Sequence, residues 1–197
     1  MPDTTLAEAL GELAALEDPK MRAANEKRGD DHGINLSRMR AVAKKIKTDQ
    51  PLAQELWGTG ETSARLLSLL ICRPKEFDAD ELDRMLRETR VPKVDDWFVN
   101  YVAKKSPLAE ELRLQWFDDP DPTVAAAAWS LTTERVVKNP DGLDLDRLLD
   151  LIERDMKDAP GRLQWSMNET LAQIGIHDPA RRPRALRIGE DLQVLAD

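Results

Sequence analysis

The hexapeptide Pro51-Leu-Ala-Gln-Glu-Leu56 returns further along the chain as Pro107-Leu-Ala-Glu-Glu-Leu112. After each copy, a short turn leads into a segment rich in small and apolar residues, 64–71 after the first and 124–131 after the second. Helix pairs that recur every few tens of residues are typical of a stack in which each pair buries its apolar face against its neighbours. A compact helical bundle is the alternative, because two similar hexapeptides can arise by coincidence.

The remainder of the chain also carries helical signals. Apolar residues recur with helical spacing, and no stretch sustains the alternation of a β-strand. Helix starts are marked where an acceptor side chain precedes proline, as at Asp18-Pro19 and Asp121-Pro122. The predicted helices span 4–15, 19–28, 36–47, 50–57, 61–72, 79–88, 95–104, 107–116, 122–138, 144–156, 162–174 and 179–195. We therefore predict an all-α, HEAT-like helical-repeat solenoid, a right-handed superhelix of antiparallel helix pairs that forms a single domain over 1–197.

Composition narrows the class of protein. Hydrophobic residues make up 41% of the 197 residues, which suffices for a core, and 29 basic against 37 acidic residues give a net charge of −8. An acidic balance opposes indiscriminate binding to polyanions, but a local basic face still permits nucleic-acid recognition. No apolar run reaches the ~18 residues of a membrane span, and the acidic N-terminus is typical of an amphipathic helix and not of a signal peptide. With one cysteine and no internal disulfide, we expect a cytoplasmic protein without a membrane partner.

The sequence lacks the motifs for nucleotide binding, metal binding and thiol catalysis. The nine glycines are scattered, so there is no phosphate-binding glycine loop. His32 and His177 lie too far apart for a metal-binding pattern, and we interpret Asp30-Asp31-His32 as a solvated turn. Cys72 ends an apolar helix and is expected to be a packed core thiol. We expect neither a metal nor a cofactor.

Two segments carry a family resemblance. His32-Gly-Ile-Asn-Leu-Ser-Arg-Met-Arg-Ala-Val-Ala-Lys44 resembles the "G-I/V…L-R-x-h-A-K" segment of the AlkD-like DNA alkylation repair proteins, and 52–65 resembles their "L-A-x-E-L-W-x-x-x-E-x-R" segment. The helix pattern and length agree over roughly 20–190. These segments are mostly architectural: Leu56 and Trp57 are expected to fill a junction between helix pairs, and Gly33 to permit a turn. They therefore indicate the fold more strongly than the activity.

The resemblance implies a superhelix whose concave face holds duplex DNA, and hydrolysis of the N-glycosidic bond of cationic alkylated purines. Such a base already leaves readily, so a carboxylate and aromatic faces suffice to stabilise the oxocarbenium-like sugar and to place a water. Family members use an Asp on a "W-D-x-V-D" helix, an Arg on the next repeat and a Trp on a later one.

This sequence departs from the family at each of those points. The segment Asp96-Trp-Phe-Val-Asn100 puts Asn100 at the position of the carboxylate. The Arg position falls at or next to Ala125, and the later Trp position falls near Glu169. A shift of register by a few residues would make Asp96, Trp129 or Trp165 the substitutes.

The candidate residues form sets along the chain. Asp96, Asn100 and Lys104 share one helix face, and Trp97 and Tyr101 the adjacent one. Asp96 and Asn100 are the candidate catalytic residues. The candidate DNA-binding residues are Trp97, Lys104, Lys105, Trp129, Arg135, Trp165, Glu169, Arg181 and Arg182.

Each candidate has a structural alternative. The polar stripe could be a solvated face, and Trp129 and Trp165 could be core or junction residues. Basic clusters, such as the one at 38–47, could be ordinary helix faces with acidic partners. The C-terminal arginines are the best basic candidates, because no acidic residue lies between Asp178 and Glu190.

The leading hypothesis is a DNA alkylation repair-type protein that binds DNA, with glycosidic hydrolysis as the activity that the resemblance implies. One alternative is a DNA-structure binder without catalysis. The other is a solenoid that uses its acidic surface to bind a protein partner.

Overall fold

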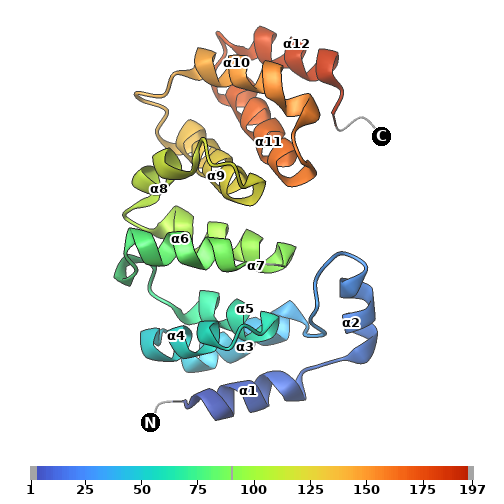
Figure 1. The fold of residues 1–197 in the computed structure, drawn as a ribbon, viewed down its shortest axis with the longest axis vertical. Helices are drawn as coiled ribbons and strands as arrows, with labels where there is room; N and C mark the ends of the chain where they lie inside the picture. Colours follow the sequence, from blue (N-terminus) through green and yellow to red (C-terminus); the bar gives the residue numbers. More distant parts are fainter. Residues whose placement is uncertain (1–3, 90, 195–197) are drawn as a thin grey trace. The chain divides into compact units, whose positions relative to one another are not determined.

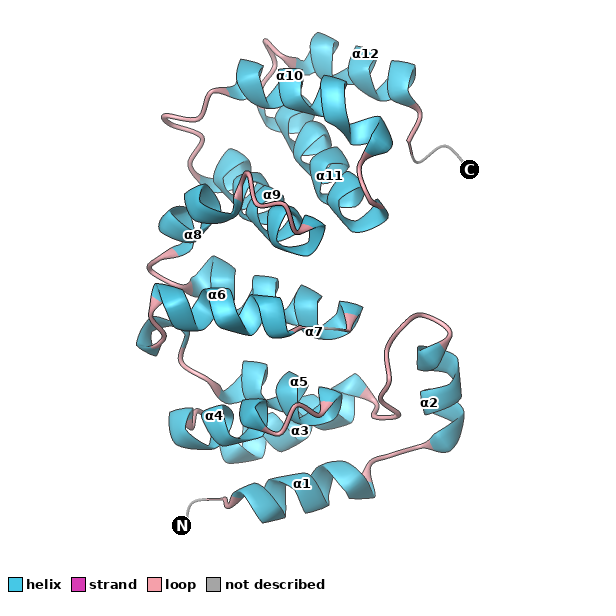
Figure 2. Cartoon of the chain, viewed as in Figure 1, coloured by secondary structure: helices cyan, strands magenta, loops and turns pink. Residues whose placement is uncertain are grey.

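The computed structural model describes residues 4–89 and 91–194, which form an all-α fold (Figure 1). Figure 2 shows helices joined by loops, and within those two ranges the only β-type pairing is an isolated bridge between Glu17 and Ile34. The chain divides into two compact units, Met1–Pro107 and Leu108–Asp197, which we call the N-terminal and the C-terminal unit. The boundary falls within the second copy of the hexapeptide. In the described part of the chain, no helix is long and apolar enough to cross a membrane.

The N-terminal unit contains seven α-helices among the described residues, several of which begin at local capping signals. They are α1 (Leu6–Ala15), α2 (Pro19–Glu26), α3 (Leu36–Ile46), α4 (Gln50–Gly58), α5 (Thr62–Ile71), α6 (Ala79–Glu88) and α7 (Pro92–Trp97). The Asp18 side chain accepts from the backbone of α2, and Asp78 and Glu81 form a capping box at the start of α6. After α7 the chain continues without a break as a π-helical turn, Phe98–Val102, and a 3-10 turn, Ala103–Lys105.

Trp57 is a packing centre of the N-terminal unit, as the sequence predicts. Its side chain is 8% exposed, and its indole N–H donates to Glu88 Oε2 at 2.9 Å. The Arg65 guanidinium lies 4.7 Å from the centre of the Trp57 ring, and the Phe98 ring lies 6.4 Å away. Cys72 is also buried, and its burial raises the pKa of the thiol to about 12, which leaves the thiol inert at neutral pH.

Gly33 is required because two segments approach closely, not because it occupies a left-handed conformation. A β-carbon there would lie 2.6 Å from the Asp18 carbonyl oxygen and would also collide with the Glu17 carboxylate, to which the Gly33 N–H donates. The prediction of a solvated turn beside it is wrong. Asp30 and His32 are 7% and 2% exposed, because the α2–α3 loop folds inward. Asp30 Oδ1 accepts from the backbone N–H of Lys93 at 2.9 Å and so caps α7.

The C-terminal unit is organised around two long helices. Its helices are α8 (Ala109–Trp116), α9 (Pro122–Lys138), α10 (Leu145–Asp155), α11 (Gly161–His177) and α12 (Arg182–Leu192). The buried alanine run 125–128 lies on α9, and hydroxyl pairs join this helix to α11, with Thr133 and Thr170 oxygens 2.8 Å apart. The core also contains Leu149, Ile152 and Ile174.

Each of the predicted helices has a counterpart in the structure, with differences at the ends. The predicted helix 95–104 begins earlier, at Pro92, because Asp30 caps it from a distant loop. The predicted helix 162–174 runs on through Gly175 to His177, and a β-carbon at Gly175 would lie 3.3 Å from the Ala185 Cβ of α12. The predicted helix 179–195 begins only at Arg182, because Asp178 Oδ1 first accepts from the Arg181 N–H in a turn.

Candidate nucleic-acid interface

Asp96 of α7 and Asn100 and Lys104 of the two turns that continue it lie along one face, as their spacing predicts. The Asn100 amide nitrogen donates to the Asp96 carbonyl oxygen at 2.8 Å. The Lys104 ammonium donates to Asn100 Oδ1 at 3.0 Å. Both ends of the Asn100 amide are therefore engaged, and the side chain acts as a neutral bridge within the stripe.

Trp97 and Tyr101 lie beside this stripe and hold basic residues against their rings. The two rings meet edge to face, with centroids 5.3 Å apart. Arg40 reaches them from α3: its guanidinium carbon lies 4.8 Å from the Trp97 ring centre, and its Nη2 donates to the Tyr101 hydroxyl at 3.2 Å. The Lys105 ammonium lies 5.2 Å from the Tyr101 ring centre. Each cation–π contact is worth about 0.5–1 kcal/mol at an exposed site.

We call Arg40, Trp97, Tyr101, Lys104 and Lys105 the cation–aromatic surface. Three of them lie on the predicted helix 95–104 and Lys105 directly follows it, but no sequence pattern connects Arg40 to them, because it is separated from Tyr101 by 61 positions. Its place in the basic stretch 38–47 was the only local signal. Trp97 is 6% exposed, so its ring supports Arg40 and presents little free face to a ligand.

The cations of this surface have no acidic partner among the residues that the structure describes. Within residues 4–89 and 91–194, neither Arg40 nor Lys104 nor Lys105 forms an ion pair with a carboxylate. On α3 itself, Lys45 does pair with Glu12 of α1. Positive charge therefore remains available on this face of a chain whose net charge is −8.

The C-terminal arginines have the opposite environment, and the expectation of an uncompensated basic segment is wrong. Arg181 forms ion pairs with Asp146 at 2.7 Å and with Asp178 at 2.8 Å. Arg184 pairs with Asp150 and with Glu153, which lie on α10. No acidic residue lies between Asp178 and Glu190 in the sequence, but Asp178 itself pairs with Arg181, and α10 supplies the other acids in space.

These ion pairs also perturb the titration of their members. The hydrogen bonds from Arg181 hold the pKa of the Asp146 carboxyl below its ordinary value, and the Asp146 and Asp178 carboxylates raise the pKa of Arg181. Arg181 and Arg184 thus belong to a network of ion pairs that joins α10 to the start of α12.

The other candidates also lie in the C-terminal unit and have mixed surroundings. Arg135 donates to the carbonyl oxygens of Asn139 and Asp141 and pairs with Glu110, so it closes the end of α9. Arg182 donates to the carbonyl oxygens of Gly175 and Ile176 at the end of α11.

The two tryptophans of this unit differ. Trp129 is 4% exposed and packs on Phe117, with ring centroids 5.0 Å apart, as its core alternative predicts. Trp165 is 60% exposed on α11, so its core alternative is wrong. Glu169 lies exposed one turn further along the same helix.

The structure thus brings Asp96, Trp97, Asn100, Lys104 and Lys105 together in one unit and keeps the remaining candidates in the other. Among the described residues, no group of three or more histidine, cysteine or acidic side chains is arranged to hold a metal ion.

Comparisons with known proteins bear on the family and on the fold. Residues 9–191 match the model of a family described as "DNA alkylation repair enzyme". A similar solved structure is described as "a new family of proteins related to the HEAT-like repeat DNA glycosylases with affinity for branched DNA structures". The match has a TM-score of 0.82 and 22% sequence identity, and it covers 95% of this chain and 83% of the other. At that identity the match establishes the HEAT-like fold alone. A comparison with curated proteins gives no match.

Proposed function

The chain belongs to the family of DNA alkylation repair enzymes, and from this premise we propose that it binds DNA through the cation–aromatic surface of the N-terminal unit. The observation that carries the proposal is the arrangement of Arg40 and Lys105 on the Trp97–Tyr101 pair, with Lys104 on the adjoining stripe. None of these three cations is paired with a carboxylate in the described part of the chain. The family's usual partner, DNA, is a polyanion that such a surface suits.

Rigid positioning of the cations strengthens the case for phosphate binding. Affinity for DNA comes largely from basic groups that neutralise phosphates and release counterions. A flexible lysine or arginine loses rotamer entropy when it binds, and this cost falls when the side chain already rests on a ring. Arg40 is held both by the Trp97 ring and by the Tyr101 hydroxyl, and the rest of its guanidinium can donate to a phosphate oxygen of the DNA backbone.

We expect DNA binding without efficient hydrolysis of the glycosidic bond, because Asn100 stands at the position where the family has a carboxylate. The transition state of glycosidic cleavage develops positive charge on the sugar, which a fixed carboxylate stabilises strongly. Asn100 offers a neutral amide whose two ends already bond to Asp96 and Lys104. The nearby ammonium of Lys104 further disfavours a cationic sugar at that point.

A preference for DNA structure follows from the same premise. The similar solved structure is described as having affinity for branched DNA. A surface that contacts phosphates but not base edges distinguishes DNAs by the path of their backbones and not by their sequence. We therefore propose that branched DNA is bound more tightly than a linear duplex.

The test is fluorescence anisotropy with a labelled linear duplex and a labelled four-way junction. Lys104→Glu with Lys105→Glu should weaken binding of both DNAs by at least about tenfold, because two phosphate contacts become repulsive. The matched control is Lys20→Glu with Lys157→Glu, which reverses two exposed lysines outside the surface. Equal losses in both double variants would overturn the placement of the site, and absence of binding to either DNA would overturn the function.

Hydrolysis by Asp96 is the second candidate, because this exposed acid lies one helical turn from Asn100 on the same face. The measurement is release of methylated purines from alkylated duplex DNA. If Asp96 is the carboxylate, Asp96→Asn abolishes release and Asn100→Ala does not. We expect negligible release from the unaltered protein, and Asn100→Asp as the substitution that raises it. Release at a rate typical of Asp-bearing relatives, unchanged by either substitution at Asp96 or Asn100, would contradict both assignments.

A further inference from the structure

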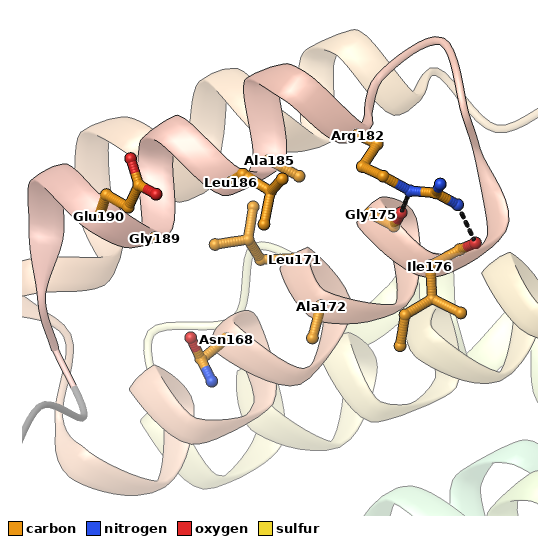
Figure 3. Close-up of a pocket in the computed structure, with 10 residues that line it drawn as sticks. All are labelled: Asn168, Leu171, Ala172, Gly175, Ile176, Arg182, Ala185, Leu186, Gly189 and Glu190. Atoms are coloured by element: carbon orange, nitrogen blue, oxygen red, sulfur yellow. Dashed lines mark hydrogen bonds between the residues drawn. The ribbon is translucent and has the colours of Figure 1, made fainter.

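A groove of about 640 Å³ runs between α11 and α12 in the C-terminal unit (Figure 3). Its wall on α11 includes Leu171, Ala172 and Ile176, and its wall on α12 includes Leu186. These side chains are apolar, and the groove lies apart from every residue of the cation–aromatic surface in the sequence. It therefore calls for an explanation other than DNA binding.

The rim of this groove exposes unusually large apolar side chains. Leu186 is 60% exposed and Ile176 is 59% exposed. Trp165, which is also 60% exposed, lies three helical turns before Ile176 and so on the same face of α11. A gathering of large exposed apolar groups on one face is typical of an interaction surface, since single proteins seldom leave such a patch in water.

Charges at the two ends of α12 show what can cover the patch. Arg182 and Glu190 line opposite ends of the groove, and Leu186 lies midway between them, four residues from each (Figure 3). All three lie on one face of the helix because they are spaced at i, i+4 and i+8. Arg182 already donates through Nε and Nη2 to carbonyl oxygens of α11, and its Nη1 makes no hydrogen bond within the described residues.

This pattern is complementary to itself. We infer that the α11–α12 face binds a second copy of the same chain about a two-fold axis that passes near Leu186. Such an axis sets two α12 helices antiparallel, so that Arg182 of each copy meets Glu190 of the other and the two Leu186 side chains meet at the centre. A two-fold interface requires one patch that matches its own rotated image, and a centred leucine with opposite charges at equal distances satisfies this requirement.

The area of the α11–α12 face limits how tightly two copies of the chain can bind each other. Helices of 17 and 11 residues are about 25 Å and 16 Å long, and side by side they cover roughly 500 Å². Two copies would then bury about 1,000 Å² in total, the lower end of specific interfaces. The dimer should consequently be weak, with a Kd in the micromolar range.

The test is sedimentation velocity of the full chain without DNA, over about 2 to 200 µM to bracket a micromolar Kd. The unaltered protein should shift from monomer to dimer as its concentration rises. Leu186→Lys should abolish the shift, because it places two ammonium groups at the centre of the interface. The matched control is Leu114→Lys, which alters a leucine of α8 that is 63% exposed and should leave association unchanged.

A pair of charge variants tests the orientation. Arg182→Glu alone sets acid against acid, and Glu190→Arg alone sets base against base, so each variant should dimerise less than the unaltered chain. An equimolar mixture of the two variants restores both opposite-charge pairs and should form a heterodimer. Circular dichroism confirms that each variant is folded before it is compared. A chain that stays monomeric over the whole range, a dimer that survives Leu186→Lys, or a mixture no more associated than its components would overturn the inference.

Discussion

In the N-terminal unit, Arg40 and Lys105 lie against aromatic rings, whereas in the C-terminal unit Arg181 and Arg184 lie against carboxylates of α10 and its neighbours. Both sets come from basic stretches of similar appearance in the sequence. Their partners determine what they can bind. A cation on an aromatic ring can still pair with a phosphate, whereas the charge of a cation between two carboxylates is already neutralised. Pairing in space, and not the local density of basic residues, therefore identifies the candidate interface.

The two units should differ most in how much one tryptophan from each contributes to stability. Trp57→Ala should lower the free energy of unfolding by about 3–5 kcal/mol, because it empties a buried site. Trp165→Ala should change it by less than about 0.5 kcal/mol, because that side chain is exposed. Urea unfolding followed by circular dichroism measures both. An unchanged midpoint for Trp57→Ala would show that the packing of the N-terminal unit is misassigned.

The next effect separates the two sets of arginines by what they bind. Arg40→Ala should weaken DNA binding about tenfold, because one positioned phosphate contact is lost. Arg184→Ala should leave the affinity of the folded protein for DNA within about twofold and instead lower stability by about 1 kcal/mol, through loss of its ion pairs on α10. Anisotropy and thermal melting of the same two variants provide the comparison. The reverse pattern would mean that the C-terminal arginines hold the DNA.

The smallest effect is a difference in acid sensitivity between the units. In the N-terminal unit, burial lowers the pKa of His32 below its ordinary value of 6.5, against the opposing pull of Asp30, Glu17 and Asp31. Below pH 6.5, His32 is protonated in the unfolded chain but stays neutral in the folded chain. The N-terminal unit therefore loses stability as the pH falls from 6.5 towards the folded-state pKa of His32.

In the C-terminal unit, Arg181 lowers the pKa of Asp146 and Asp178 below their ordinary value of 3.8. Their contribution is complete above that value and is lost only as the pH falls through the folded-state pKa values. Hydrogen exchange at about pH 7.5 and pH 5.5, corrected for the intrinsic rates, should therefore show weaker protection at the lower pH in the N-terminal unit alone. His32→Asn keeps a hydrogen-bond acceptor for the Ile34 N–H but cannot protonate, and it should remove the difference.

The sequence predicted the fold well because its signals are local. Capping at Asp18 and Asp121 lies within a few residues of the helix that it starts, and the burial of Trp57 follows from an apolar helix face. The stripe from Asp96 to Lys104 was predictable for the same reason, since helical spacing alone places its members together.

The surroundings of the site were not predictable, because they depend on tertiary contacts. Arg40 meets Tyr101 across 61 positions, and Arg181 meets Asp146 across 35. No pattern along one helix indicates such partners. The lack of acids between Asp178 and Glu190 was therefore misleading, because α10 supplies acidic partners, and the contact of Arg40 with the aromatic pair could not be foreseen. The extension of α11 through Gly175 has the same origin, because its close packing on Ala185 is a contact between helices.

The salt dependence of DNA binding reports how many phosphates the cation–aromatic surface contacts. The logarithm of the association constant falls linearly with the logarithm of salt concentration, with a slope of about −0.9 for each phosphate contacted. Lys104→Ala with Lys105→Ala should make the slope less negative by about 2 and weaken binding, since two such contacts are removed. Lys20→Ala with Lys157→Ala should leave the slope unchanged. A slope that is identical in all three proteins would contradict DNA binding through the cation–aromatic surface.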